Sequence, residues 1–97
     1  MRIEFTRTGG FAGVRVAKTL DADAMPAAEA NHLTALVESA RFFELPGELR
    51  SSGSDQFQYK LTVEMGGKSH TVVVDERAVP PTLAPLVNEL LAAARKR

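Results

Sequence analysis

Cysteine is missing from the 97-residue sequence. Its absence excludes disulfide bridges, thiolate metal ligands and cysteine nucleophiles, so packing must supply the stability. Long apolar runs are missing as well, since no segment approaches the ~18 consecutive apolar residues of a membrane span. The alternating residues Met1–Arg7 also lack the apolar core of roughly 7 to 15 residues found in secretory signals. We therefore expect a cytoplasmic protein with no membrane partner.

An excess of charge of either sign is also absent. Twelve Lys and Arg residues balance twelve Asp and Glu residues, so the totals give no electrostatic footprint for nucleic acid or an anionic membrane. The hydrophobic content of 44% and the charged content of 25% are ordinary for a globular chain. A chain of this length has room for one core, and we expect residues 1–97 to form a single interaction domain.

The sequence begins with a predicted β-hairpin. Apolar and polar residues alternate over residues 2–8, with Ile3 and Phe5 on one face, which is the period of a half-buried strand. The glycine-rich segment Gly9–Gly13 interrupts the alternation, which resumes from Val14. A five-residue tip of this kind is compatible with antiparallel pairing of the two strands.

A second hairpin is predicted together with its register. Apolar and polar residues alternate over residues 57–65, and Gly66–Gly67 supplies the positive φ angles of a two-residue turn. If these glycines form the loop, Met65 pairs with Lys68. The same register places apolar residues opposite one another, namely Val72 with Leu61 and Val74 with Tyr59.

Between the hairpins, apolar residues recur at helical spacing. Asp21 or Asp23 can cap this helix, and Pro26 falls in its first turn, where a missing N–H is tolerated. We expect the helix to end near Phe42–Phe43, whose rings pack at its end. Residues 45–54 then form a connector with strong turn signals.

A final helix is predicted near the C-terminus. Thr82 can cap it, Pro85 stays inside its first turn, and a broad apolar stripe follows. The element order is therefore ββαββα. We expect an α+β fold, a two-layer sandwich in which two helices cover one face of a four-stranded antiparallel sheet.

Candidate catalytic groups are few. His32 lies in the first predicted helix and His70 on the core-facing side of the last strand, and neither has the spacing of a metal-ligand pair. We interpret both as structural or surface histidines. Asp75 and Glu76 are adjacent, but successive strand residues point to opposite faces, which argues against a paired acid and base. We therefore predict that the protein is not an enzyme and uses no metal or cofactor.

The predicted sheet also argues against RNA binding, because its polar face carries no aromatic stack and Phe57 and Tyr59 fall on the apolar face. The tip Gly9–Gly13 has neither the lysine nor the following helix of a phosphate-binding loop. It does place Phe11 among glycines, and leaving such a ring in water forfeits roughly 1.5 to 3 kcal/mol. Two interpretations stay open. Phe11 folds back over the open end of the core, or a partner's hydrophobic pocket covers it.

Several segments taken together resemble a known family. They are Met1–Arg7 running into Gly9–Gly13, then Phe42–Pro46, Asp55–Tyr59 and Pro80–Leu86. The sequence resembles the emfourin family of bacterial protein inhibitors over nearly its whole length, most specifically from the N-terminus through Gly13. The resemblance implies a cytoplasmically made inhibitor of thermolysin-like, protealysin-type zinc metallopeptidases that has no cofactor of its own.

The resemblance also suggests where inhibition occurs. Thermolysin-like enzymes favour a bulky apolar side chain directly after the scissile bond, as the family implies, and Phe11 has that chemistry. We take the first hairpin tip as the inhibitory element, with two polar neighbours, so that the predicted peptidase-binding residues are Arg7, Thr8, Gly9, Gly10, Phe11, Ala12 and Gly13. The main alternative is a noncatalytic protein-binding domain with a different partner. An enzyme or a nucleic-acid binder is a third possibility, and DNA affinity that falls steeply with salt would favour the latter.

Overall fold

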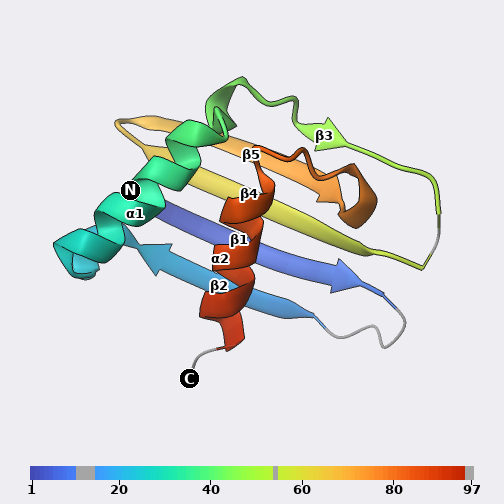
Figure 1. Cartoon of the computed structure of the whole chain (residues 1–97), viewed down its shortest axis with the longest axis horizontal. Helices are drawn as coiled ribbons and strands as arrows, with labels where there is room; N and C mark the ends of the chain where they lie inside the picture. Colours follow the sequence, from blue (N-terminus) through green and yellow to red (C-terminus); the bar gives the residue numbers. More distant parts are fainter. Residues whose placement is uncertain (11–14, 54, 96–97) are drawn as a thin grey trace.

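The computed structural model describes residues 1–10, 15–53 and 55–95. The α+β class is confirmed, and both α-helices lie across the same face of one sheet (Figure 1). The elements in chain order are β1 (Arg2–Gly9), β2 (Val16–Asp21), the 3-10 helix η1 (Ala22–Ala24), α1 (Ala27–Ser39), the 3-10 helix η2 (Phe42–Glu44), β3 (Glu48–Leu49), β4 (Phe57–Met65), β5 (Lys68–Asp75), the 3-10 helix η3 (Glu76–Ala78) and α2 (Ala84–Arg95).

The sheet differs from the prediction in one strand. Its order is β2-β1-β4-β5-β3, and β3 pairs in parallel with β5, so the sheet is five-stranded and mixed. The carbonyl of Gly47 also accepts a hydrogen bond from the Val73 N–H at 2.8 Å. β3 lies inside the segment predicted as a connector. Its two residues pair because the chain passes along the edge of β5, and no local sequence pattern predicts this long-range pairing. The predicted four-stranded antiparallel sheet and the order ββαββα are therefore wrong in this detail.

The register of the second hairpin is confirmed. Met65 pairs with Lys68, so Gly66–Gly67 forms the turn between β4 and β5. Leu61 lies opposite Val72 and Tyr59 opposite Val74, as the alternation predicts. The turn and the two strands are adjacent in sequence, and local chemistry was sufficient to define them.

The first hairpin is confirmed as an antiparallel pair. Arg2 lies opposite Asp21 and Arg7 opposite Val16. β1 runs one residue further than predicted, to Gly9, because it also pairs on its other side with β4, where Gly9 lies opposite Phe57. Val14, where the alternation was expected to resume, lies outside the described residues.

The first helix begins later and ends earlier than predicted. Asp21 caps the 3-10 helix η1, accepting the Asp23 N–H at 3.0 Å. α1 starts after Pro26 and is followed by Arg41, whose φ of 49° is left-handed. Such an angle is uncommon outside glycine and ends the helix before Phe42. The chain then turns Phe42 into the core, where it is 1% exposed.

The second helix has the predicted apolar stripe. It begins at Ala84, two residues beyond the expected cap Thr82, and Pro85 falls in its first turn as predicted. The N–H groups of Leu83 and Ala84 both donate to the Pro80 carbonyl, at 2.9 and 3.0 Å, in the turn before the helix. None of the described helices combines the length and apolarity needed to cross a membrane.

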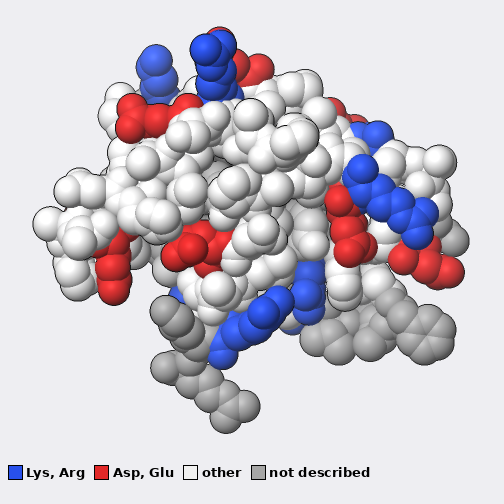
Figure 2. Space-filling view, viewed as in Figure 1, with Lys and Arg blue, Asp and Glu red and all other residues white. Residues whose placement is uncertain are grey.

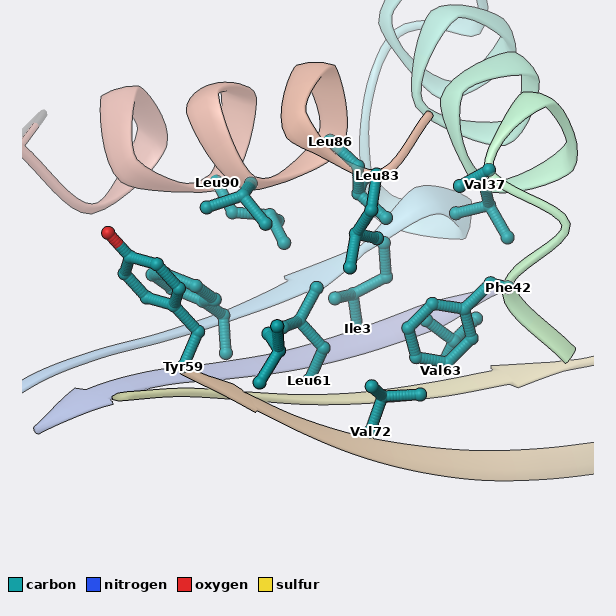
Figure 3. Close-up of a cluster of buried hydrophobic side chains, with 14 of the residues drawn as sticks. Ile3, Val37, Phe42, Tyr59, Leu61, Val63, Val72, Leu83, Leu86 and Leu90 are labelled. Atoms are coloured by element: carbon teal, nitrogen blue, oxygen red, sulfur yellow. The ribbon is translucent and has the colours of Figure 1, made fainter. Parts of the chain in front are cut away.

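The core lies between the helices and the sheet (Figure 3). Alternate residues of β1, β4 and β5 point toward α1 and α2 and bury the same face, as the period-2 pattern requires. The fully buried large side chains are Phe5, Phe42, Ile3, Leu61, Leu83, Leu86, Leu90, Val37, Val63, Val72 and Val74. Tyr59 is also in this core, whereas Phe57 is only half-buried at its border, so the prediction that both are core residues holds fully for Tyr59 alone.

Candidate functional site

The predicted peptidase-binding segment is described only at its base. Arg7, Thr8 and Gly9 end β1 and Gly10 follows, whereas Phe11, Ala12 and Gly13 lie outside the described residues. The base lies at the end of β1 that extends beyond α2 (Figure 1).

Both glycines of the base are required by their surroundings. Gly9 and Gly10 have φ angles of +82° and +74°, which side chains disfavour. A Cβ built on Gly10 would lie 2.8 Å from Cδ1 and 3.0 Å from Cζ of the Phe57 ring, closer than real contacts allow. A Cβ on Gly9 would lie 3.0 Å from the carbonyl oxygen of Gln56. The base of the hairpin thus rests directly on residues 56–57.

Arg7 packs on Phe57, and we refer to residues 56–57 as the support of the hairpin base. Its guanidinium carbon lies 4.2 Å from the centroid of the Phe57 ring, within the range of a cation–π contact. Its Nε is buried and has no hydrogen-bond partner among the described residues. Arg7 also lies opposite Tyr59. Burial raises the pKa of the Tyr59 phenol, Glu76 adds to the rise, and Arg7 opposes it.

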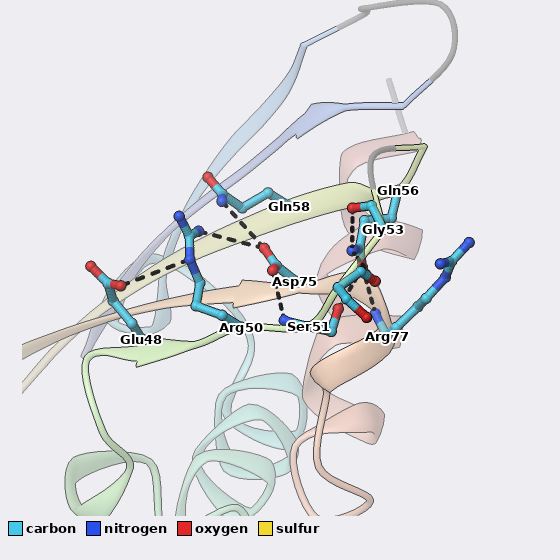
Figure 4. Close-up of polar contacts among 9 residues, drawn as sticks. Glu48, Arg50, Ser51, Gly53, Gln56, Gln58, Asp75 and Arg77 are labelled. Atoms are coloured by element: carbon cyan, nitrogen blue, oxygen red, sulfur yellow. Dashed lines mark hydrogen bonds and ion pairs between the residues drawn. The ribbon is translucent and has the colours of Figure 1, made fainter.

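Gln56 links the support to two other segments (Figure 4). Its Oε1 accepts hydrogen bonds from Ser51 Oγ at 2.9 Å and from the Arg77 N–H at 3.1 Å. Its Nε2 donates to the carbonyls of Ser52 and Gly53, at 3.3 and 3.0 Å. Its own carbonyl accepts the Gly10 N–H at 3.2 Å. One residue therefore connects the loop after β3, the helix η3 and the hairpin base.

A carboxylate fixes the beginning of the same loop. Asp75 Oδ2 accepts the Ser51 N–H at 2.9 Å, and Oδ1 contacts Gln58 Nε2 at 3.3 Å and the Arg50 guanidinium at 3.5 Å (Figure 4). The pKa of Asp75 lies below its ordinary value, chiefly because of the Ser51 N–H, with burial opposing and Gln58 and Arg50 assisting. Glu76 instead accepts the Phe57 N–H at 3.0 Å. The adjacent carboxylates therefore make separate structural contacts.

Both histidines lie away from the hairpin base. His70 Nε2 is 2.7 Å from the Leu45 carbonyl, and its ring meets Phe42 edge-on at 5.6 Å. His32 is exposed on α1, 3.8 Å from Glu89 of α2. These contacts support the interpretation of His70 as structural and His32 as a surface residue. No group of His, Asp and Glu side chains able to hold a metal occurs within residues 1–10, 15–53 and 55–95.

Charge is distributed without a dominant sign on the helical side. Figure 2 shows described acidic and basic side chains around the rim of this face and a mostly uncharged middle. A shallow groove on the opposite, polar face of the sheet is lined by residues including Glu4, Arg15, Lys60 and Thr62. Its charged lining residues are the basic Arg15, Lys18 and Lys60 and the acidic Glu4, so the groove is locally basic although the charges of the whole sequence balance.

The sequence model of the Emfourin family matches residues 5–91. The chain belongs to the Emfourin family. The match covers the hairpin base as well as the loop and helix η3 that support it. It confirms the resemblance and indicates a role as a metallopeptidase inhibitor, with a peptidase as the general partner. No curated protein and no solved structure matches the chain.

Sequence reasoning missed the support beneath the Emfourin hairpin. Gln56 and Arg77 are 21 residues apart, and no spacing rule joins a side-chain amide to a distant backbone N–H. The polar residues 51–54 signalled turns only. One available signal was the pair Gly9–Gly10, because a glycine pair next to a strand can mark close backbone approach as well as a turn. That signal would not have identified Phe57 as the neighbour.

Proposed function

We propose that this Emfourin protein inhibits thermolysin-like, protealysin-type zinc metallopeptidases by inserting its first hairpin into their active-site cleft. Family membership supports the class of partner. The observation that supports the hairpin is its base, where Gly9 and Gly10 rest on residues 56–57 at the end of the sheet that extends beyond α2 (Figure 1). A base held in this way is suited to presenting a cleft-binding segment, since the base itself needs little further ordering on binding.

The proposed roles within the hairpin follow from side-chain chemistry. Phe11 fills the apolar specificity pocket of the peptidase, where burial of one aromatic ring supplies much of the binding energy. The neighbouring glycines let the backbone approach the cleft wall while keeping a peptide bond out of attack geometry. Thr8 and Arg7 contribute polar contacts at the rim. Phe11, Ala12 and Gly13 lie outside the described residues, so their roles rest on sequence chemistry alone.

A titration tests the proposed function. Purified protein is added to a thermolysin-like metallopeptidase with a chromogenic peptide substrate, and a serine peptidase is the control. We expect inhibition of the first enzyme and unchanged activity of the second. Absence of inhibition over a panel of thermolysin-like enzymes would favour a noncatalytic binding domain with another partner.

A substitution tests the placement of the site. Phe11→Ala removes the proposed pocket-filling ring, and we expect inhibition to weaken by at least tenfold, equivalent to about 1.4 kcal/mol. Circular dichroism confirms the fold of the variant. An unchanged inhibition constant would contradict the role of Phe11 while leaving peptidase inhibition itself standing.

A further inference from the structure

The side chain of Gln56 is held in a single orientation by its neighbours. The Arg77 N–H can only donate, and the carbonyls of Ser52 and Gly53 can only accept, so the amide oxygen must face η3 and the amide nitrogen must face the loop. All the donors and acceptors involved are contacted within 3.3 Å. The side chain therefore ties the loop after β3 to η3.

The main chain of the same residue holds the hairpin. The Gln56 carbonyl accepts the Gly10 N–H at 3.2 Å, one residue beyond the end of β1. The next residue, Phe57, places its ring against Gly10, and Arg7 covers that ring. Any rotation of the 56–57 backbone would move the hydrogen-bond acceptor and the ring together. The position of the hairpin base thus depends on the conformation of residues 56–57, which the Gln56 side chain fixes together with Glu76, the acceptor of the Phe57 N–H at 3.0 Å.

We infer that Gln56 is a positioning residue for the inhibitory hairpin, acting through the Gly10 N–H and the Phe57 ring rather than by touching the peptidase. The inference rests on the proposed function. According to this inference, the segment around Gln56, distant in sequence, keeps Gly9–Gly10 in the binding conformation in the free protein. A base that leaves this position part of the time reduces the fraction of binding-competent molecules, and apparent affinity falls by that fraction.

Two substitutions at Gln56 test the inference. Gln56→Met keeps the length of the side chain and removes its hydrogen bonds, and Gln56→Ala removes both. We expect each variant to inhibit about tenfold more weakly, since several hydrogen bonds of modest individual strength are lost. The loss appears in the apparent association rate constant, because fewer molecules are competent to bind. A residue that touched the peptidase would instead raise the dissociation rate constant.

A second readout needs no peptidase. Amide hydrogen exchange at Gly10, measured by NMR, should accelerate several-fold in both variants while the amides of β5 stay protected. Thr62→Val is the matched control. It removes a side-chain hydrogen bond of β4, the strand that begins directly after Gln56, between Thr62 Oγ1 and Thr71 Oγ1 at 2.8 Å, on the polar face away from the hairpin base. We expect Thr62→Val to change neither Gly10 exchange nor inhibition.

The outcomes separate this inference from the proposed function. If the unmodified protein inhibits and the Gln56 variants match it, or lose affinity only through faster dissociation, the positioning role is wrong. If the unmodified protein fails to inhibit, the proposed function fails. Hydrogen exchange at Gly10 then still tests whether the Gln56 side chain holds the hairpin base. Unchanged exchange in both variants would show that it does not. Weaker inhibition with slower association and faster Gly10 exchange supports the role.

Discussion

Two glycine pairs in this protein serve two different physical purposes. Gly66–Gly67 joins β4 to β5 with φ angles of +59° and +78°, and a Cβ on either residue would meet nothing within 4 Å. Gly9–Gly10 has similar angles of +82° and +74°, yet a Cβ there would meet the Gln56 carbonyl or the Phe57 ring. Gly66–Gly67 provides a turn, whereas Gly9–Gly10 allows the close approach of the backbone to residues 56–57.

The difference extends to what holds each hairpin in place. The β4–β5 turn follows directly from strands that pair over their whole length, from Gln58–Asp75 to Met65–Lys68. The base of the β1–β2 hairpin also packs on residues 56–57, which are held by the Gln56 side chain and by the hydrogen bond from the Phe57 N–H to Glu76. One hairpin is a local structure. The β1–β2 hairpin is coupled to the loop before β4, which is distant in sequence. We propose that this hairpin carries the peptidase-binding segment.

Replacing one glycine of each pair by alanine tests this comparison, and we expect it to give the largest change in the free energy of unfolding. Gly66→Ala carries only the left-handed backbone cost, about 1 kcal/mol. Gly10→Ala carries that cost and also pushes the Phe57 ring out of place, for a total loss of about 2 to 4 kcal/mol. Urea unfolding at neutral pH measures both. Equal losses for the two variants would contradict the distinction between the pairs.

A double substitution separates the two parts of the Gly10 effect. In a Phe57→Ala background the ring is absent, so Gly10→Ala should then cost about 1 to 2 kcal/mol, as expected for the backbone alone. Gly66→Ala in the same background is the control, and its cost should not change. A Gly10 effect that is independent of Phe57 would show that the ring does not limit this position.

The same contrast explains how far the sequence could predict the structure. The register of β4 and β5 follows from alternation and one Gly-Gly turn, because all the determinants are neighbours in the chain. β3 was missed since its two residues, Glu48 and Leu49, pair only where the chain happens to pass β5. The first hairpin, predicted from alternation and glycine content, is confirmed as an antiparallel pair, although Gly9 belongs to β1 rather than to the tip. The support of its base was not predicted, because hydrogen bonds such as Gln56 to Arg77 join residues without a pattern.

Acid should weaken the contacts by which Asp75, at the end of β5, holds the Ser51 N–H and Gln58. The pKa of Asp75 is lowered in the folded protein, so its contribution to stability is complete above the unfolded value of about 3.9 and is lost as pH falls through the folded value. Asp75→Asn should therefore be less stable than the unmodified protein at pH 7, with the gap narrowing at about pH 3. Urea unfolding at both pH values measures the gap. A gap of constant size would contradict the assignment.

The smallest expected effect concerns Arg7, whose charge covers the ring that supports Gly10. Arg7→Met keeps an apolar stem on Phe57 and removes a buried Nε without a described partner, so the lost cation–π contact and the removed desolvation penalty oppose each other. We expect the free energy of unfolding to stay within about 0.5 kcal/mol of the unmodified value. Because the fold is then nearly unperturbed, the inhibition constant of Arg7→Met measures the contribution of the Arg7 charge to peptidase binding. Unchanged inhibition would limit Arg7 to support, whereas weaker inhibition that grows less pronounced at high salt would place its guanidinium against the peptidase.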